Sequence, residues 1–212
     1  MAEQITAVQF HTALIGLCDT IEEQKDYLSE LDGAIGDGDH GVNMAKCFRG
    51  VKKNLEALEV KDVASVMNCV GMEVMNSVGG AMGALYGTLF LKMAMTSVAK
   101  NEVGVSEFAA MLTEALNGIL TIGKAKVGDK TLVDTLTPAV NAVTQAAEAG
   151  KPLNEALGDF EAAAKSGMES TKDLMAKIGR ASRLGERTIG HQDAGATSCF
   201  FILQSFAKAY QA

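Results

Sequence analysis

Apolar residues recur three or four positions apart along most of this chain, in stretches separated by polar segments that carry glycine. This spacing places apolar side chains on one face of a helix and predicts about eight helices. We expect them at 5–28, 44–58, 63–74, 89–98, 106–119, 133–143, 153–168 and 199–210. Ser106 is the expected N-cap of the fifth helix. No alternation of apolar and polar residues predicts a strand.

Four glycine-bearing polar segments interrupt the helical pattern, at 32–41, 77–88, 123–130 and 179–195. They recur about every second helix. In an up-and-down bundle, loops two helices apart lie at the same end, so we expect the four segments to converge on one rim. The sequence therefore predicts a single all-α domain over residues 1–212, with a functional site at that rim.

The composition is typical of a helical protein. Only 5% of the residues are aromatic and Trp is absent, so we expect a core of Ala, Leu, Val, Ile and the 11 Met. The net charge of −7 argues against binding of nucleic acid or of an anionic membrane, since both need a positive field. A nucleotide is not excluded, because a bound divalent cation can reverse the local sign of a site.

The cysteines and the N-terminus indicate the compartment. Cys18, Cys47, Cys69 and Cys199 lie far apart without a CxxC pair, which is typical of reduced thiols in the core of a cytosolic protein. Residues 1–5 lack a basic region followed by an apolar run, and no segment approaches the roughly 18 apolar residues of a membrane span. We therefore expect a soluble, cytoplasmic protein.

The segment 32–41 is a candidate metal site. Asp32, Asp37 and Asp39 are separated by glycines, and carboxylates this close repel each other unless a cation joins them. Mg²⁺ prefers carboxylate oxygen and keeps room for phosphate oxygens, and the helix that follows favours phosphate at its N-terminus. An exposed Asp/Gly turn is the plain alternative. A calcium EF-hand fails, because its twelfth position would be Phe48 rather than Glu and its sixth lacks Gly.

The other three segments add weaker indications. Glycines at 79–83 can bring backbone N–H groups against phosphate, or can simply allow close helix packing. The segment 123–131 nearly matches a P-loop, but it has one residue too many before Lys130 and no preceding strand, so a P-loop fold is rejected. The segment 179–198 carries three Arg and could face a metal–phosphate centre, or be a solvated loop with exposed Arg–Glu pairs.

These motifs resemble, in order and spacing, the nucleotide-binding subunit of dihydroxyacetone kinases. The matching segments are IGDGDHG at 35–41, SVGGA at 77–81, GKA at 123–125, GDKT at 128–131, GRAS at 179–182, LGER at 184–187 and GHQD at 190–193. The resemblance runs over essentially the whole chain. It implies an all-α barrel of eight antiparallel helices with the nucleotide in the loops at one end.

The resemblance also implies a set of site residues. Asp32, Asp37 and Asp39 would hold two Mg²⁺ ions that bridge the phosphates of ADP or ATP. The residues implied to contact the nucleotide are His40, Gly41, Val42, Asn43, Ala81, Met82, Gly123, Leu132, Arg180, Gly195, Ala196 and Thr197. Metal ions and cationic donors carry most of the catalysis in phosphoryl transfer, and no residue is assigned as a general base.

The resemblance further implies partners. Dihydroxyacetone would be bound to a histidine of a separate kinase subunit. The phosphate would come from a phosphohistidine protein of the phosphotransferase system, which recharges bound ADP, or from free ATP. Two other functions stay open: an ATP-consuming kinase subunit for a related ketose such as a tetrulose, and a nucleotide- or metal-sensing regulatory module without turnover. A homodimer is among the assemblies left open.

The chain departs from the family pattern at several positions near the site. Met82 stands where Ser is usual, Leu132 where Met is usual, and Arg183 where an aromatic residue is common. Ala84 and Ala194 replace frequent prolines. The aspartates are intact, so nucleotide binding remains the prediction. The departures leave open whether the nucleotide is permanently bound and which ketose is phosphorylated.

Overall fold

The computed structural model describes residues 4–211. Within that range the chain forms nine α-helices, two short strands and two 3-10 helices. In chain order they are β1 (Ile5–Thr6), α1 (Ala7–Glu23), α2 (Lys25–Ile35), α3 (His40–Glu56), α4 (Val63–Ser77), α5 (Gly80–Thr96), β2 (Glu102–Val103), α6 (Val105–Gly123), α7 (Leu132–Glu148), α8 (Leu153–Ser170), η1 (Thr171–Asp173), η2 (Ala181–Thr188) and α9 (Ala194–Ala209).

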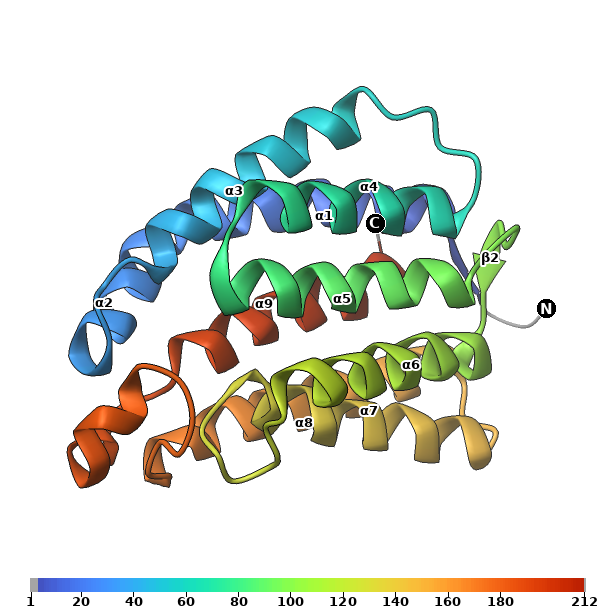
Figure 1. Ribbon diagram of the computed structural model, residues 1–212. Coiled ribbons are helices and arrows are strands. Elements are labelled where there is room, and N and C mark those ends of the chain that lie inside the picture. Colours follow the sequence, from blue (N-terminus) through green and yellow to red (C-terminus); the bar gives the residue numbers. More distant parts are fainter. Residues whose placement is uncertain (1–3, 212) are drawn as a thin grey trace.

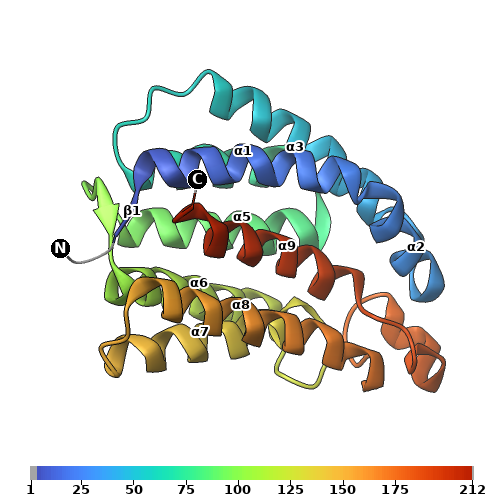
Figure 2. The same ribbon diagram turned by 180° about the vertical axis from the view of Figure 1, so that it is seen from behind.

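Eight of the described helices close into a ring. Each packs against the next in the order α1, α3, α4, α5, α6, α7, α8, α9, and α9 returns to α1 (Figures 1 and 2). Helix α2 lies outside the ring and extends α1 beyond one end, where it packs on α3. Antiparallel helices with apolar inner faces bury those faces against each other in this arrangement. The predicted all-α barrel is confirmed.

The core consists mainly of the expected Ala, Leu, Val, Ile and Met, and a group of phenylalanine rings packs among them. Phe10, Phe90, Phe108, Phe160 and Phe206 have no exposed surface. Their rings meet mostly edge to face, with centroids 5.4 Å apart for the pair Phe108–Phe160 and 6.0 Å apart for Phe90–Phe206. Such pairs add stabilisation beyond the area that they bury. Five rings from five helices thus add to a core that is otherwise mostly aliphatic, as predicted.

The first predicted helix has the wrong boundaries near the site. The helix expected at 5–28 is interrupted at Gln24, and its second part continues to Ile35, so Asp32 lies on a helix rather than in a loop. Helix α2 packs closely on α3. A Cβ atom at Gly41 would lie 1.9 Å from the carbonyl oxygen of Lys25, so only glycine lets the two helices approach this closely.

The second glycine-rich segment is also shorter than expected. Only Val78 and Gly79 separate α4 from α5, and the residues from Gly80 to Thr88 are helical. The glycines serve a tight turn: Gly80 has a φ of +70°, and a Cβ atom at Gly83 would lie 1.8 Å from the carbonyl oxygen of Val78. The N-terminus of α5 therefore lies directly at the rim.

The start of α6 corrects the expected N-cap. The cap is Gly104 rather than Ser106, because the side chain of Glu107 accepts a hydrogen bond from the Gly104 N–H at 3.2 Å. Helix α6 also has the length and composition of a membrane span, contrary to our expectation for the sequence. It is nevertheless a wall of the barrel, packed between α5 and α7, as expected of an apolar core helix.

The expectation of no strands is wrong at one place. Ile5–Thr6 pairs antiparallel with Glu102–Val103, with Ile5 opposite Val103. Two residues are too few to produce an alternating pattern. This ribbon lies at the end of the barrel opposite to the glycine-bearing connections (Figure 1).

The four glycine-bearing connections lie at the same end of the barrel. The links α2–α3, α4–α5, α6–α7 and α8–α9 gather at the left of Figure 1 and at the right of Figure 2. The predicted convergence on one rim is confirmed. Residues far apart in the sequence meet there, and the candidate site is built from them.

Candidate metal and phosphate site

The three aspartates form a compact cluster. Asp32 comes from the last turn of α2, Asp37 from the α2–α3 link and Asp39 from the N-cap position of α3. One carboxylate oxygen of each lies within 4.8 Å of the others. The link is tight: Gly38 has a φ of +77°, and a Cβ atom at Gly36 would lie 2.4 Å from Asp32 Oδ1. Three carboxylate oxygens at this spacing fit a hard divalent cation such as Mg²⁺.

Arg180 reaches this cluster from the α8–α9 connection. Its Nη1 donates to Asp37 Oδ2 and lies 3.6 Å from Asp39 Oδ2. The structure therefore places one of the three arginines of this connection at the aspartates. Arg183 and Arg187 are exposed and form no ion pair within residues 4–211. One guanidinium beside three carboxylates lets the same site hold cations and phosphate oxygens.

Three helices begin at the same end of the barrel as the cluster, and they differ in how their first N–H groups are used. At α9, Asp193 is the N-cap and accepts from Ala196 N at 2.7 Å. At α3, His40 N donates to Asp32 Oδ2 at 3.3 Å. At α5, the N-cap is Gly79, and no side chain caps the helix. The first N–H groups of α5, at Gly80 to Met82, are therefore the best placed to bind an anion.

A chain of hydrogen bonds joins the same three helices. His40 Nε2 lies 2.9 Å from Ser198 Oγ, and Ser198 Oγ lies 2.6 Å from the hydroxyl of Tyr86. That hydroxyl also donates to the carbonyl oxygen of Gly195 at 2.9 Å. Burial lowers the pKa of His40, although Asp32 and Asp39 oppose the shift. Burial thus favours the neutral ring of His40, and the contact with Ser198 orients it at the start of α3.

The implied nucleotide residues all reach this rim, but they differ in accessibility. Val42 and Ala81 are exposed, Gly41 and Leu132 are buried, and Gly123 ends α6. Asn43, in the first turn of α3, donates its N–H to Asp39 O at 2.9 Å.

Two implied residues of α9 are engaged within the protein. Ala196 is buried, and its N–H donates to Asp193. The Thr197 hydroxyl accepts from Gln192 and donates to the carbonyl oxygen of Asp193. Both groups would have to exchange these partners to bind a ligand directly.

The departures from the family pattern also have defined places. Met82 packs against the barrel core, Ala84 is exposed on α5, and Ala194 is buried as the first residue of α9. Arg183 is exposed. None of the four touches the aspartate cluster through a hydrogen bond or ion pair in the described part of the chain.

Several polar residues that shape the site were missed from the sequence. Tyr86 and Ser198 had no signal, because each lies in an apolar helix and its partners are distant. Asp134 had one. It accepts from Gly128 N at 2.5 Å and from Thr131 N at 2.7 Å, the second bond being half of a Thr131–Asp134 capping box. A Thr followed three residues later by an acidic residue is recognisable in sequence.

A comparison with known families now identifies the class. The model of the DAK2 domain matches residues 34–208 of this chain, which is well over half of its length. The protein belongs to the DAK2 domain family.

Curated relatives narrow the resemblance. The chain is 40% identical over 191 residues to the PEP-dependent dihydroxyacetone kinase, ADP-binding subunit DhaL, of Escherichia coli K12, covering 90% of this chain and 91% of that one. It is 41% identical over 191 residues to the PTS-dependent subunit DhaL of Lactococcus lactis, covering 89% and 90%. L-erythrulose kinase of Pectobacterium atrosepticum is 33% identical, but the chain spans only 30% of its length. The sequence is of the DhaL type, and the resemblance seen in its motifs is confirmed.

Solved structures agree on the fold. The dihydroxyacetone kinase of C. freundii superposes with a TM-score of 0.73 at 22% identity, covering 98% of this chain and 35% of that chain. The complex of that enzyme with AMP-PNP and Mg²⁺ gives a TM-score of 0.70 at 20% identity. Identity this low supports the shared all-α architecture alone.

Proposed function

We propose that this protein is the nucleotide-binding subunit of a dihydroxyacetone kinase. It binds ADP or ATP with Mg²⁺ at the rim and passes a phosphoryl group to dihydroxyacetone held on a partner subunit. The observation that carries the proposal is the cluster of Asp32, Asp37 and Asp39 with Arg180 beside it and the uncapped N-terminus of α5 at the same rim. The DhaL relatives, matched over nine tenths of both chains, support it.

The three aspartates are the proposed ligands of two Mg²⁺ ions. Bound ions would neutralise charge on the phosphate oxygens during transfer. Arg180 supplies a further positive charge, and the N–H groups of Ala81 and Met82 supply neutral donors. His40 and Gly41 to Asn43 line the phosphate side, while Gly123, Leu132 and Gly195 to Thr197 frame the rest of the nucleotide. Cationic and N–H donors fixed in advance stabilise charge where it forms, without rearrangement.

We infer that the phosphate donor is a phosphohistidine protein of the phosphotransferase system rather than free ATP. The E. coli and L. lactis relatives are named as PEP- and PTS-dependent, and the match covers about nine tenths of each of them. The erythrulose kinase, in contrast, is a longer protein of which this chain spans less than a third. The names of these relatives thus support a system in which ADP stays bound and is recharged in place.

Reconstitution tests the proposal. The mass of the natively purified protein is first measured by native mass spectrometry, which identifies retained nucleotide and metal. It is then mixed with the ketone-binding subunit and either the phosphohistidine donor or ATP, and ketose phosphate is measured. We expect retained ADP, two Mg²⁺ ions, and dihydroxyacetone phosphate from the phosphohistidine donor. Product only from ATP would support the ATP-consuming kinase, a faster reaction with a tetrulose would change the substrate, and no product from either donor would support a sensing module.

We also propose a cytoplasmic protein whose one domain spans residues 1–212, with residues 1–3 and 212 outside the described part. Neither nucleic acid nor a membrane is among its proposed partners. Sedimentation of the purified protein distinguishes a monomer from a homodimer.

A further inference from the structure

Lys130 is buried although it resembles the lysine of a P-loop in sequence. Its side chain is 2% exposed, and its backbone has a φ of +62° in the left-handed region. Its Nζ donates to the carbonyl oxygen of Thr171 at 2.5 Å and to that of His191. Burying an ammonium group is costly unless it is paired and hydrogen-bonded. The two carbonyl groups are therefore the reason that Lys130 can lie inside the protein.

These two carbonyl groups lie near the two ends of the connection between α8 and α9. We call residues 171–193 the Arg180 segment, because it leaves α8 at Thr171, carries Arg180 and returns at α9. Its two ends are joined where they meet: Gly190 N donates to Lys172 O at 2.7 Å, and Asp193 N donates to Thr171 Oγ1 at 3.1 Å. We call this junction of the two ends the neck of the segment. Lys130 bonds to both sides of the neck, at Thr171 and at His191.

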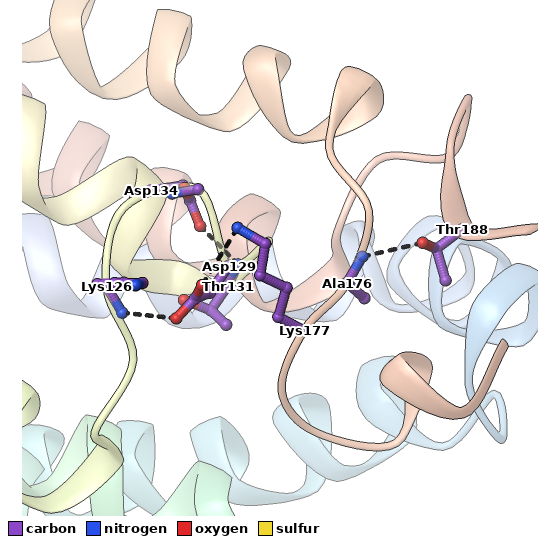
Figure 3. Close-up of polar contacts among 8 residues, drawn as sticks. Lys126, Asp129, Thr131, Asp134, Ala176, Lys177 and Thr188 are labelled. Carbon is purple, nitrogen blue, oxygen red and sulfur yellow. Dashed lines mark hydrogen bonds and ion pairs between the residues drawn. The ribbon is translucent and has the colours of Figure 1, made fainter. Parts of the chain in front are cut away.

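The loop that carries Lys130 is itself well held. Asp134 fixes it from within by accepting two of its N–H groups, and Asp129 accepts from Lys126 N at 2.9 Å. Lys177, in the Arg180 segment, donates its N–H to Asp129 O at 3.2 Å, and its Nζ lies 3.7 Å from Asp129 Oδ1 (Figure 3). Figure 3 also shows the hydrogen bond from Ala176 N to Thr188 Oγ1, which ties the segment to itself.

We propose that Lys130 is a positioning residue: by closing the neck of the Arg180 segment it holds Arg180 beside Asp37 and Asp39. The inference rests on the proposed nucleotide site, because Arg180 matters there through its contact with phosphate. The charge of Lys130 is opposed by burial, which lowers its pKa, and is supported by the nearby carboxylates of Asp193, Asp134 and Asp173. Lys130 itself need not touch the ligand.

A double-mutant cycle tests this role. Lys130→Met keeps the aliphatic length but removes the N–H donors, and Arg180→Ala removes the positioned group. Affinity for Mg·ADP is measured by titration calorimetry for the wild type, both single variants and the double variant. We expect Lys130→Met to weaken binding roughly ten-fold, the loss of about one hydrogen bond to a charged group. In the Arg180→Ala background the same change should cost less than about two-fold, because Lys130 acts through Arg180.

Hydrogen exchange supplies the second measurement. Amides of the Arg180 segment should exchange faster in Lys130→Met, while those of α5 and α6 stay protected. Lys172→Met is the matched control: Lys172 is exposed at the same neck, and its side chain makes no hydrogen bond or ion pair within residues 4–211. It should leave both affinity and exchange unchanged. If Lys130→Met does not fold, Thr171→Val, which removes the acceptor of Asp193 N, replaces it in the cycle.

Two results would overturn the proposal. One is an equal loss of affinity with and without Arg180, since Lys130 would then act on the whole fold or on the ligand. The other is unchanged exchange in the Arg180 segment of Lys130→Met. Failure of the wild type to bind Mg·ADP would instead refute the proposed function, and the exchange experiment would still decide whether Lys130 closes the neck.

Discussion

His40 Nε2 lies 2.9 Å from Ser198 Oγ, although the two residues are 158 positions apart in the chain. The contact links the first residue of α3 to the fifth residue of α9. Through the Tyr86 hydroxyl it extends to α5. Because all three helices begin at the candidate site, a single hydroxyl fixes the spacing of three helix N-termini around the position proposed for the phosphates.

Removing the Ser198 hydroxyl should weaken the site more than the fold. We expect Ser198→Ala to lower Mg·ADP affinity about five-fold, equivalent to about 1 kcal/mol for a lost hydrogen bond. Titration calorimetry measures the effect. Ser205→Ala is the control on the same helix, because its hydroxyl bonds only locally, to Ile202 O at 2.7 Å. Equal affinities for the two variants would show that His40 needs no partner from α9.

Asp37 should couple metal binding to stability. A ligand bound only to the folded state stabilises it by about 2.7 kcal/mol at a concentration 100 times its Kd. Asp37→Asn removes a carboxylate charge from the cluster, so we expect the rise in Tm on adding Mg·ADP to shrink or disappear. Asp26→Asn serves as the control, since that side chain is 95% exposed. An undiminished rise in Tm for Asp37→Asn would contradict the proposed metal site.

Two glycine-to-alanine changes should have opposite effects on stability. The added Cβ of Gly41→Ala would lie 1.9 Å from Lys25 O, so α2 and α3 must separate, at a cost of about 2–4 kcal/mol. Gly158 lies on the exposed face of α8 with no atom within 4 Å of an added Cβ. Gly158→Ala should therefore stabilise the protein by about 0.5–1 kcal/mol. Urea unfolding compares the two, and a neutral Gly41→Ala would contradict the close helix contact.

Asp193 should make stability depend on pH in the acid range. Burial raises the pKa of Asp193 to about 6, from an ordinary value of 3.8. Because the folded state holds this proton more tightly than the unfolded state, the contribution of Asp193 is greatest below pH 3.8 and is lost as the pH rises through about 6. The loss is at most about 3 kcal/mol, at about 1.4 kcal/mol for each pKa unit.

Asp193→Asn removes this titration and keeps an amide oxygen that can cap α9. Relative to the wild type, the variant should gain stability as the pH is raised from 4 to 6.5, and the difference should then stay constant. Unfolding free energies from urea titrations at several pH values check this. Parallel curves for the two proteins would show that Asp193 titrates normally in the folded state.

The local pattern of the sequence determined most of the helices and the position of the aspartate cluster. Apolar spacing near 3.6 depends only on neighbouring residues, and it located all eight walls of the barrel. The aspartate cluster could be predicted equally well, because Asp32, Asp37 and Asp39 lie within eight positions of each other and the glycines between them set the turn. The convergence of the four loops on one end followed from the alternating direction of successive helices in an up-and-down bundle.

Tertiary contacts decided what the local pattern left open. The close approach of α2 and α3 depends on contact between Gly41 and Lys25, and the ribbon at Ile5 depends on Val103. Lys130 is the clearest case: its sequence context only came close to a P-loop, which was rejected, whereas the fold shows that its Nζ bonds to the carbonyl oxygens of Thr171 and His191. Periodicity and motifs report the chemistry of neighbouring residues, but the partner of a buried polar group is set by how distant segments pack, and that information is not local.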